Sequence, residues 1–323
     1  MKKLASTIVF IFMATLLIGC SSDSSATKEN KFPEKDITLI VPKAPGGGTD
    51  LTARGLAEYA KKQIDQNIVV VNKPSGNGVT GMVEGSKAKK DGYTLTMTTV
   101  ELAMLPHMNR SPVDYKDFSP IVAPIADPAS IMVPADAPYN TLEEFLEHAK
   151  KNPGKLKVGN SGVGTIFHLA SVAVEDKTGV KFTHVPYNEG SAPAVAALVG
   201  GHLDAVSVAP GIAKAQIDAG KIKVLAIMSD EKLPLFPEVP TFKELGYDIT
   251  IRAWAALNAP ADTPDEIMDS LNEIFSKTSK DPEFKKFLEK QGIQPVEIEG
   301  EELKNMIEED HNYYGELLKD MKL

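Results

Sequence analysis

Apolar runs alternate with helical patterns from about residue 36 onward, and the first repeat of this alternation is the clearest. Residues Ile37–Val41 form a nearly continuous apolar run, typical of a strand that is buried on both faces of a sheet. Three glycines at 46–48 follow, with Thr49 and Asp50 behind them, and residues 51–63 carry their apolar side chains on one helical face. The pattern predicts a strand, a glycine turn and a capped helix.

The same alternation continues through most of the chain. The expected strands are 68–71, 93–99, 157–159, 181–185, 205–208 and 222–227, and the expected helices are 167–176, 191–199 and 212–219. Gly179, Gly200 and Gly220 stand where a glycine commonly ends a helix. This order predicts βαβ units and therefore an α/β fold, with mostly parallel sheets and helices on both faces.

Two strand-like segments suggest where the chain passes between lobes. Residues 121–134 are apolar but interrupted by prolines, and residues 249–258 form a second such segment. If the two segments are paired crossovers, the C-terminal helices expected at 264–291 and 300–321 return to the first lobe. We expect lobe 1 to comprise 32–128 and 252–323 and lobe 2 to comprise 129–251, which is the topology of a hinged two-lobe binding protein.

The N-terminus carries an export signal. Lys2 and Lys3 precede an apolar run at 8–18, which has the length of a secretory core and is too short to span a bilayer comfortably. The run ends in LIGCSS, which resembles the lipobox of bacterial lipoproteins, where cleavage leaves an acylated cysteine. We expect a signal peptide at 1–19, a lipid on Cys20 and a flexible tether at 20–31. An ordinary signal peptide with a chance cysteine is the alternative.

Composition narrows the class of protein. The chain has 323 residues, of which 42% are hydrophobic and 24% charged, and this balance excludes a disordered chain and a multi-span membrane protein. The net charge is −9, and loss of Lys2 and Lys3 leaves 33 basic against 44 acidic residues, or −11. Such a chain is not a general nucleic-acid binder. The single cysteine excludes an intramolecular disulfide and leaves a thiolate zinc site without its second sulfur.

Two glycine-rich loops are the candidate binding elements. In the first, Gly46, Gly47 and Gly48 expose backbone N–H groups at a helix N-terminus, where an anion is favoured. The spacing fits neither a dinucleotide fingerprint nor a P-loop. The second loop, GNSGVGT at 159–165, again lies between a strand and a helix, so two such loops could hold a ligand with two acidic ends. Either loop alone could be an ordinary tight turn, as could a third loop at 75–78.

Longer segments carry a resemblance to a known family. They are 37–54 (ITLIVPKAPGGGTDLTAR), 91–95, 159–169 (GNSGVGTIFHL), 185–187, 200–204 and 238–247. Together they resemble the substrate-binding receptors of tripartite tricarboxylate transporters, also called the Bug or TctC-like family, from about residue 32 to the C-terminus. The resemblance implies a periplasmic binding protein with two α/β lobes. It also implies a partner permease with one large and one small membrane subunit, driven by an ion gradient.

The resemblance also implies a binding site. In this family a carboxylate is held by backbone amides and short polar side chains, often through ordered water, instead of by an arginine clamp. Carried over by position, the ligand-binding residues are Gly46, Gly47, Gly48, Thr49 and Asp50 in the first lobe and Ser161, Gly164 and Thr165 in the second, with Tyr187 and Asp204 nearby. Asp50 could orient the loop or be only a helix cap, and Asp204 could be only a turn residue.

The chain also departs from the family pattern. Lys43 stands where the family commonly has an aromatic residue, and Val163 where it often has Asn. The segment 188–190 is one residue longer than usual, which leaves the role of Glu189 open. We hypothesise that Glu101 tunes the site toward a ligand with an amino group or a protonated acid, the alternative being a solvated loop carboxylate. His168 is expected to pack on its helix, and Trp254 to line the crossover or the core.

Three functional classes remain. The first is an exported solute-binding lipoprotein that captures a small organic carboxylate, such as a di- or tricarboxylate, an acidic amino acid or an aromatic acid, for a tripartite permease. A sensor that touches a membrane signalling partner would use the same site. An exported hydrolase is the third, although no nucleophile elbow and no metal motif is present. We expect a monomer without cofactor, held at a membrane and facing the periplasm or the cell exterior, and the identity of the ligand and of the membrane stays open.

Overall fold

The computed structural model describes residues 32–188 and 190–319. The expected signal peptide, Cys20, the tether and Glu189 lie outside the described residues. Within the part of the chain that is described, no helix has the length and apolar character needed to cross a bilayer.

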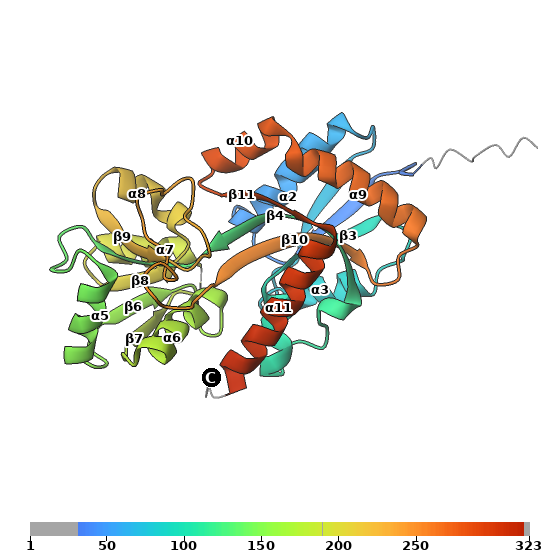
Figure 1. Cartoon of the computed structure of the whole chain (residues 1–323). Coiled ribbons are helices and arrows are strands. Elements are labelled where there is room, and N and C mark those ends of the chain that lie inside the picture. Colours follow the sequence, from blue (N-terminus) through green and yellow to red (C-terminus); the bar gives the residue numbers. More distant parts are fainter. Residues whose placement is uncertain (1–31, 189, 320–323) are drawn as a thin grey trace, which may run out of the picture. The chain divides into compact units, whose positions relative to one another are not determined.

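The first sheet has six strands in the order β11-β4-β10-β3-β1-β2 (Figure 1). The strands β1, β2 and β3 are parallel, whereas β10 runs antiparallel to β3 and β4, and β11 runs antiparallel to β4. Their bounds are β1 (Ile37–Val41), β2 (Ile68–Asn72), β3 (Thr94–Thr99), β4 (Phe118–Pro128), β10 (Arg252–Pro260) and β11 (Pro295–Glu299).

The second sheet has five strands in the order β7-β6-β8-β5-β9. Here β6, β7 and β8 are parallel, and β5 runs antiparallel to β8 and β9. The bounds are β5 (Ser130–Pro134), β6 (Lys157–Asn160), β7 (Thr183–Pro186), β8 (Ala205–Val208) and β9 (Ile222–Ile227). Both sheets are therefore mixed: the expected parallel order holds for the βαβ strands, and every antiparallel pair involves one of the crossover strands β4, β5 and β10.

Helices cover both faces of the first sheet. On one face α2 (Gly48–Tyr59), α9 (Asp265–Lys280) and α10 (Pro282–Lys290) bury side chains such as Leu56, Phe275 and Phe284 against the strands. The other face is packed by α3 (Val79–Ser86), α4 (Glu101–Met104) and α11 (Gly300–Lys319), through Met82 and Leu303 among others. Short 3-10 turns lie at Ala60–Lys62, Leu105–Met108 and Tyr115–Asp117.

The second sheet has helices of its own. They are α5 (Leu142–Lys151), α6 (Ile166–Thr178), α7 (Ser191–Val199) and α8 (Lys214–Asp218), with a 3-10 turn at Pro210–Ala213 before α8. The α5 helix begins because Thr141 accepts a hydrogen bond from the N–H of Glu144, and its buried stripe includes Leu142 and Phe145.

The crossover strands pair as expected. Arg252 of β10 lies opposite Pro128 of β4, and the ladder continues to Pro260 opposite Phe118. Only Ala129 separates β4 from β5, so one extended segment serves both sheets. The N–H of Ala129 donates to the carbonyl of Ile251, at 2.8 Å.

The expected helix at 264–291 is broken into α9 and α10. Pro282 cannot donate a helical hydrogen bond, and Asp281 caps the new helix by accepting from the N–H of Glu283, at 2.8 Å. The break turns α10 so that Phe284 packs beside Tyr59 of α2, with ring centroids 5.9 Å apart.

A buried polar contact joins α11 to the crossover. Trp254 of β10 is 1% exposed, and its indole Nε1 donates to Asp310 of α11 at 2.7 Å. Arg252 approaches the other carboxylate oxygen of Asp310 at 3.3 Å. Trp254 therefore belongs both to the crossover strand and to the core.

Candidate functional site

The first glycine loop follows the carboxyl end of β1 and opens α2. Gly46 has a φ of +84°, which disfavours any other residue, and Gly47 is the N-cap of α2 without a side-chain cap. The N–H groups of Gly48 and Thr49 make no hydrogen bond to any described residue. Because free N–H groups at a helix N-terminus carry partial positive charge, this end of α2 favours an anion.

The buried carboxylate of Asp50 holds the first glycine loop in place. It is 1% exposed, and its carboxylate accepts from the N–H of Gly46 at 2.8 Å, from Arg54 at 3.0 Å and from Asn72 at 2.8 Å. Burial alone would raise the pKa of Asp50, but the hydrogen bonds from Arg54, Gly46 and Asn72 outweigh it and hold that pKa below its usual value. The carboxylate is thus committed to the loop.

An ion pair stands beside the first loop. Lys43 follows β1 and Glu101 follows β3, and because these neighbouring strands are parallel, both residues lie at the same edge of the sheet. Lys43 Nζ is 2.7 Å from Glu101 Oε1, and the side chains are 28% and 6% exposed. Burial tends to raise the pKa of Glu101, yet the charge and hydrogen bond of Lys43 lower it overall. The charge of Glu101 is therefore matched within the chain.

The second glycine loop lies between β6 and α6. Gly164 has a φ of +73°, and its N–H donates to Nδ1 of His168 at 3.1 Å. The N–H of Gly162 donates to Asn160 at 3.0 Å, and the N–H of Thr165 donates to the carbonyl of Gly162 at 3.3 Å. The hydroxyls of Ser161 and Thr165 are 2.8 Å apart. This loop therefore spends much of its hydrogen-bonding capacity on itself.

His168 is buried under the second loop as a neutral acceptor. Burial, aided by the nearby charge of His184, lowers the pKa of His168 to about 4. A ring that stays neutral near pH 7 can accept the Gly164 N–H at Nδ1. The sequence predicts His168 only as a residue that packs on its helix. Its hydrogen bond with Gly164 could not be predicted, because it depends on the turn between the two residues.

Two buried polar atoms behind the second loop lack partners. Asn160 Nδ2 and Ser207 Oγ make no hydrogen bond to any described residue, and both side chains are 0% exposed. Register between β6 and β8 places Asn160 beside Ser207 at the carboxyl ends of their strands. Because buried polar atoms are nearly always paired, such a spot favours a bound polar group.

The remaining predicted residues divide into two groups. Half-buried Tyr187 follows β7, and its N–H donates to the carbonyl of Asn160 at 3.0 Å, so it lies beside the second loop. Asp204 precedes β8, and its carboxylate accepts from the N–H of Lys157 at 2.7 Å. Lys157 is the first residue of β6, whereas the second glycine loop follows the last residue of that strand. Asp204 therefore lies at the opposite end of the strands, about 10 Å from the loop. The structure does not bring Asp204 together with the other predicted residues.

The third loop touches the first. Gly78 caps α3, and a Cβ built on Gly78 would lie 2.6 Å from the carbonyl oxygen of Pro42, four residues before Gly46 of the first glycine loop. This backbone contact is closer than a side chain allows, so the turn at 75–78 supports the segment that carries Lys43.

Contacts between the two α/β parts involve residues that no sequence pattern singled out. A Cβ built on Gly164 would lie 3.1 Å from Nη1 of Arg110, and one built on Gly211 would lie 1.9 Å from the carbonyl oxygen of Gly292. The neighbouring Ile293 packs 3.8 Å from a Cβ built on Gly48. Segments far apart in sequence therefore meet at both glycine loops. Tertiary contacts of this kind leave no local signal in the sequence.

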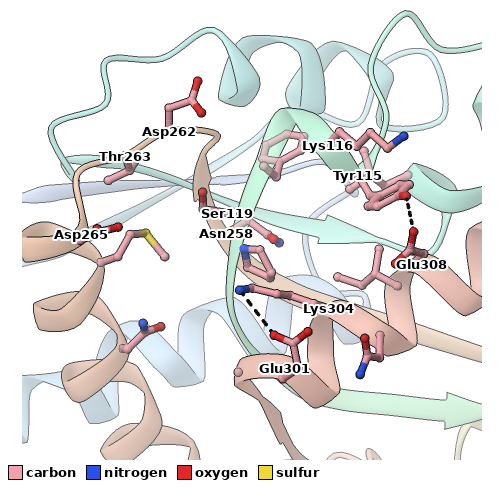
Figure 2. Close-up of a pocket in the computed structure, with 18 of the residues that line it drawn as sticks. Tyr115, Lys116, Ser119, Asn258, Asp262, Thr263, Asp265, Glu301, Lys304 and Glu308 are labelled. Atoms are coloured by element: carbon pink, nitrogen blue, oxygen red, sulfur yellow. Dashed lines mark hydrogen bonds and ion pairs between the residues drawn. The ribbon is translucent and has the colours of Figure 1, made fainter.

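A groove elsewhere on the first part of the chain is distinct from these loops. It encloses about 690 Å³ between α9, α11 and β4, and neither glycine loop lines it. Figure 2 shows two side-chain pairs in this groove: Glu308 accepts from Tyr115 at 3.2 Å, and Glu301 lies 3.8 Å from Lys304. Because the groove contains neither of the loops that follow the parallel strands β1 and β6, the loops are the better candidate site.

Comparison with known proteins identifies the family. A family model described as the tripartite tricarboxylate transporter family receptor matches residues 52–323. A UPF0065 protein from the gbd 5′ region of Cupriavidus necator is 34% identical over 288 residues, covering 88% of this chain and 87% of the relative. The crystal structure of a TctC solute-binding protein from Polaromonas is 39% identical, with a TM-score of 0.81, and the match covers 90% of this chain and 100% of that one.

Two further solved structures carry ligands. MatC from Rhodopseudomonas palustris, with bound malate, is 26% identical with a TM-score of 0.74, over 89% of this chain and 100% of that one. The R. palustris protein Rpa4515, with adipate, is 26% identical with a TM-score of 0.78, over 89% and 97%. The matching family model, the relatives and the shared two-lobe fold lead to one conclusion: this chain belongs to the substrate-binding receptors of the tripartite tricarboxylate transporters, the Bug or TctC-like family.

Proposed function

We propose that this receptor captures a small organic carboxylate between two lobes, 32–128 with 252–323 and 129–251, and delivers it to a tripartite permease. The observation that carries the proposal is the pair of glycine loops, each at the carboxyl end of a parallel strand and each opening a helix. Ligands of α/β folds are commonly bound at that edge of the sheet. The bound malate and adipate of two related structures support a carboxylate.

A ligand screen tests the proposal directly. Malate, adipate, citrate, glutamate and benzoate would be added in thermal-shift and calorimetric titrations. A true ligand at 100 times its Kd adds about 2.7 kcal/mol to the free energy of unfolding. We expect at least one di- or tricarboxylate to stabilise the protein and to be recovered chemically unchanged. Turnover of the acid would instead indicate an enzyme.

Gly47→Val tests the first loop. Gly47 is exposed, and a Cβ built on it meets only the Ala44 carbonyl oxygen at 3.8 Å, an ordinary contact. The variant should therefore unfold at nearly the same urea concentration as wild type. Its side chain would occupy the space in front of the N–H groups of Gly48 and Thr49, so carboxylate binding should be lost. Normal affinity in a folded Gly47→Val protein would remove this loop from the site.

We also propose that Cys20 carries the lipid that holds the receptor at the membrane. The support is the position of the only cysteine directly after the apolar run of the signal. Mass spectrometry of the mature protein should find an acylated N-terminal cysteine, and Cys20→Ser should release the protein from the membrane fraction. An unmodified Cys20 in mature protein would contradict the assignment.

A further inference from the structure

Asn72 stands beside the point where the chain leaves the first sheet for the first glycine loop. It is the last residue of β2, and the parallel register pairs it with Val41, the last residue of β1. The N–H of Lys73 donates to the carbonyl of Val41 at 2.7 Å, so the backbone around Asn72 is fixed to β1. The strand expected at 68–71 ends before Asn72, and none of the sequence motifs includes it.

The side-chain amide of Asn72 joins the two ends of the first loop. Its Nδ2 donates to the carbonyl oxygen of Lys43 at 3.0 Å and to Asp50 Oδ1 at 2.8 Å. Lys43 precedes the three glycines and Asp50 follows them, so the two N–H donors of one amide hold both ends of the segment. The other carboxylate oxygen of Asp50 accepts from the N–H of Gly46 at 2.8 Å.

Arg54 fixes the orientation of this amide. Its Nη2 donates to Asn72 Oδ1 at 3.0 Å, and its Nε donates to Asp50 Oδ2 at 3.0 Å. A flipped amide would place its N–H groups against the guanidinium and its oxygen against a carbonyl and a carboxylate. The three side chains Asn72, Asp50 and Arg54 therefore form one polar clasp around the ends of the loop.

The three glycines themselves are held by little packing. Beyond its chain neighbours, a Cβ built on Gly46 meets no heavy atom within 4 Å, and one built on Gly47 or Gly48 meets a single atom at 3.8 Å. Glycine also loses more backbone freedom on ordering than any other residue. The shape of the loop therefore depends on the polar clasp. The N–H groups of Gly48 and Thr49, which make no hydrogen bond to any described residue, lie between its two ends.

We infer that Asn72 is a positioning residue of the binding site: its amide holds the first glycine loop in the shape that offers the N–H groups of Gly48 and Thr49 to an anion. This inference rests on the proposed function and goes beyond it, because it assigns a role in affinity to a residue outside both glycine loops. A loop that is ordered before binding costs the ligand less free energy than a loop that the ligand has to order.

The polar clasp depends on the charge of Asp50. Burial raises the pKa of Asp50, and the hydrogen bonds from Arg54, Gly46 and Asn72 together more than offset that effect. Loss of the Asn72 donor should therefore move the pKa of Asp50 upward. Because a protonated carboxyl holds the Gly46 N–H less strongly, the loop should loosen at a higher pH in a variant without this amide.

Calorimetry with malate and adipate tests the inference on Asn72→Leu and a matched control. Leucine has nearly the shape of asparagine but donates no hydrogen bond, so we expect binding about 10- to 100-fold weaker than in wild type. Arg54→Gln, at a side chain that is 49% exposed, should also weaken binding, because the amide of Asn72 can then flip. Asn67→Leu is the control: Asn67 donates to Asp36 at 3.3 Å at the other end of β2, and its loss should leave affinity unchanged.

Nuclear magnetic resonance of the ligand-free protein adds a readout that a general loss of stability does not move. In protein labelled with nitrogen-15 glycine, the amide shift of Gly46 should follow the ionisation of Asp50, whose carboxylate accepts its hydrogen bond. The midpoint of this titration should lie at a higher pH in Asn72→Leu than in wild type, and at the wild-type pH in Asn67→Leu.

The outcomes separate this inference from the proposed function. If wild type binds no carboxylate in the screen, the proposed function fails, whereas the Gly46 titration still decides whether Asn72 holds the loop. If folded Asn72→Leu binds malate or adipate as tightly as wild type, or no more weakly than Asn67→Leu, the role of Asn72 is overturned and the proposed function stands. An unchanged Gly46 midpoint in Asn72→Leu would overturn that role as well.

Discussion

At the scale of single residues, His168 is the buried base whose charge state supports the second loop. Its pKa is lowered to about 4 by burial and by His184, whereas in the unfolded chain it has the ordinary value of about 6.5. Between these values the unfolded chain binds a proton that the folded chain does not. Stability from this residue is therefore complete above about pH 6.5 and is lost as the pH falls toward 4, by on the order of 3 kcal/mol.

His168→Gln isolates this contribution. Urea unfolding of wild type should show a steeper loss of stability between about pH 7 and pH 4.5 than the variant shows, since glutamine does not titrate. His148→Gln, at an exposed histidine of α5, should retain the wild-type pH profile. Parallel pH profiles for wild type and His168→Gln would show that His168 does not carry the proton.

The residues of the two glycine loops could be predicted from sequence because their chemistry is local. A glycine run followed by Thr49 and Asp50 identifies a helix start within a few residues. The proximity of Arg110 to Gly164 and of Asn160 to Ser207 could not be predicted, because both depend on contacts across strands and across the fold. Asp204 was placed by resemblance alone. The order of strands shows that it precedes β8, and a residue at that end lies away from the loop edge.

At the scale of elements, the buried hydrogen bond from Trp254 to Asp310 is one of the contacts that attach α11 to the crossover. Trp254→Phe keeps most of the packed ring but removes the indole N–H that Asp310 accepts. A buried carboxylate that loses a donor should lower the free energy of unfolding by about 1–3 kcal/mol. The substitution also removes the only tryptophan of the chain, so the change in the free energy of unfolding is measured by urea unfolding followed by circular dichroism.

Tyr313→Phe serves as the comparison for that helix. Its hydroxyl is buried without a described partner, so its removal deletes no hydrogen bond and should leave stability equal or higher. If Trp254→Phe were as stable as wild type, the bond to Asp310 would contribute nothing net to the attachment of α11.

Elements with a strong local pattern were predicted well, and short or composite ones were not. Helix α7 and strands β8 and β9 have the expected bounds, because glycines or polar turns mark both ends. The short helix α4 follows β3 without any turn signal, and β11 is only half-buried and depends on pairing with β4. Antiparallel pairing of the crossovers likewise comes from tertiary arrangement, which a strand pattern alone does not contain.

At the scale of the whole molecule, an acidic protein is proposed to collect an anion. The net charge is −9, and long-range repulsion should slow the approach of a dicarboxylate even though the site itself favours it. The Debye length shrinks from about 30 Å at 0.01 M salt to about 8 Å at 0.15 M. Association of malate or adipate, followed by stopped-flow fluorescence of Trp254, should therefore become faster over this range. A rate constant that falls with salt would mean that the local cations dominate the approach.

The contact between Gly211 and Gly292 has a consequence for how this receptor can vary. A Cβ on either glycine would come within 1.9 Å or 2.7 Å of the other's carbonyl oxygen, so the two main chains meet with no side chain between them. Any side chain in place of either glycine would push the two main chains apart, so the distance between them cannot be adjusted in small steps. Lys43, Glu101 and the half-exposed Val163 do have side chains at the loops. The distance between the two backbones is therefore set at positions other than Lys43, Glu101 and Val163, and these side chains can change while the fit of the backbones stays the same.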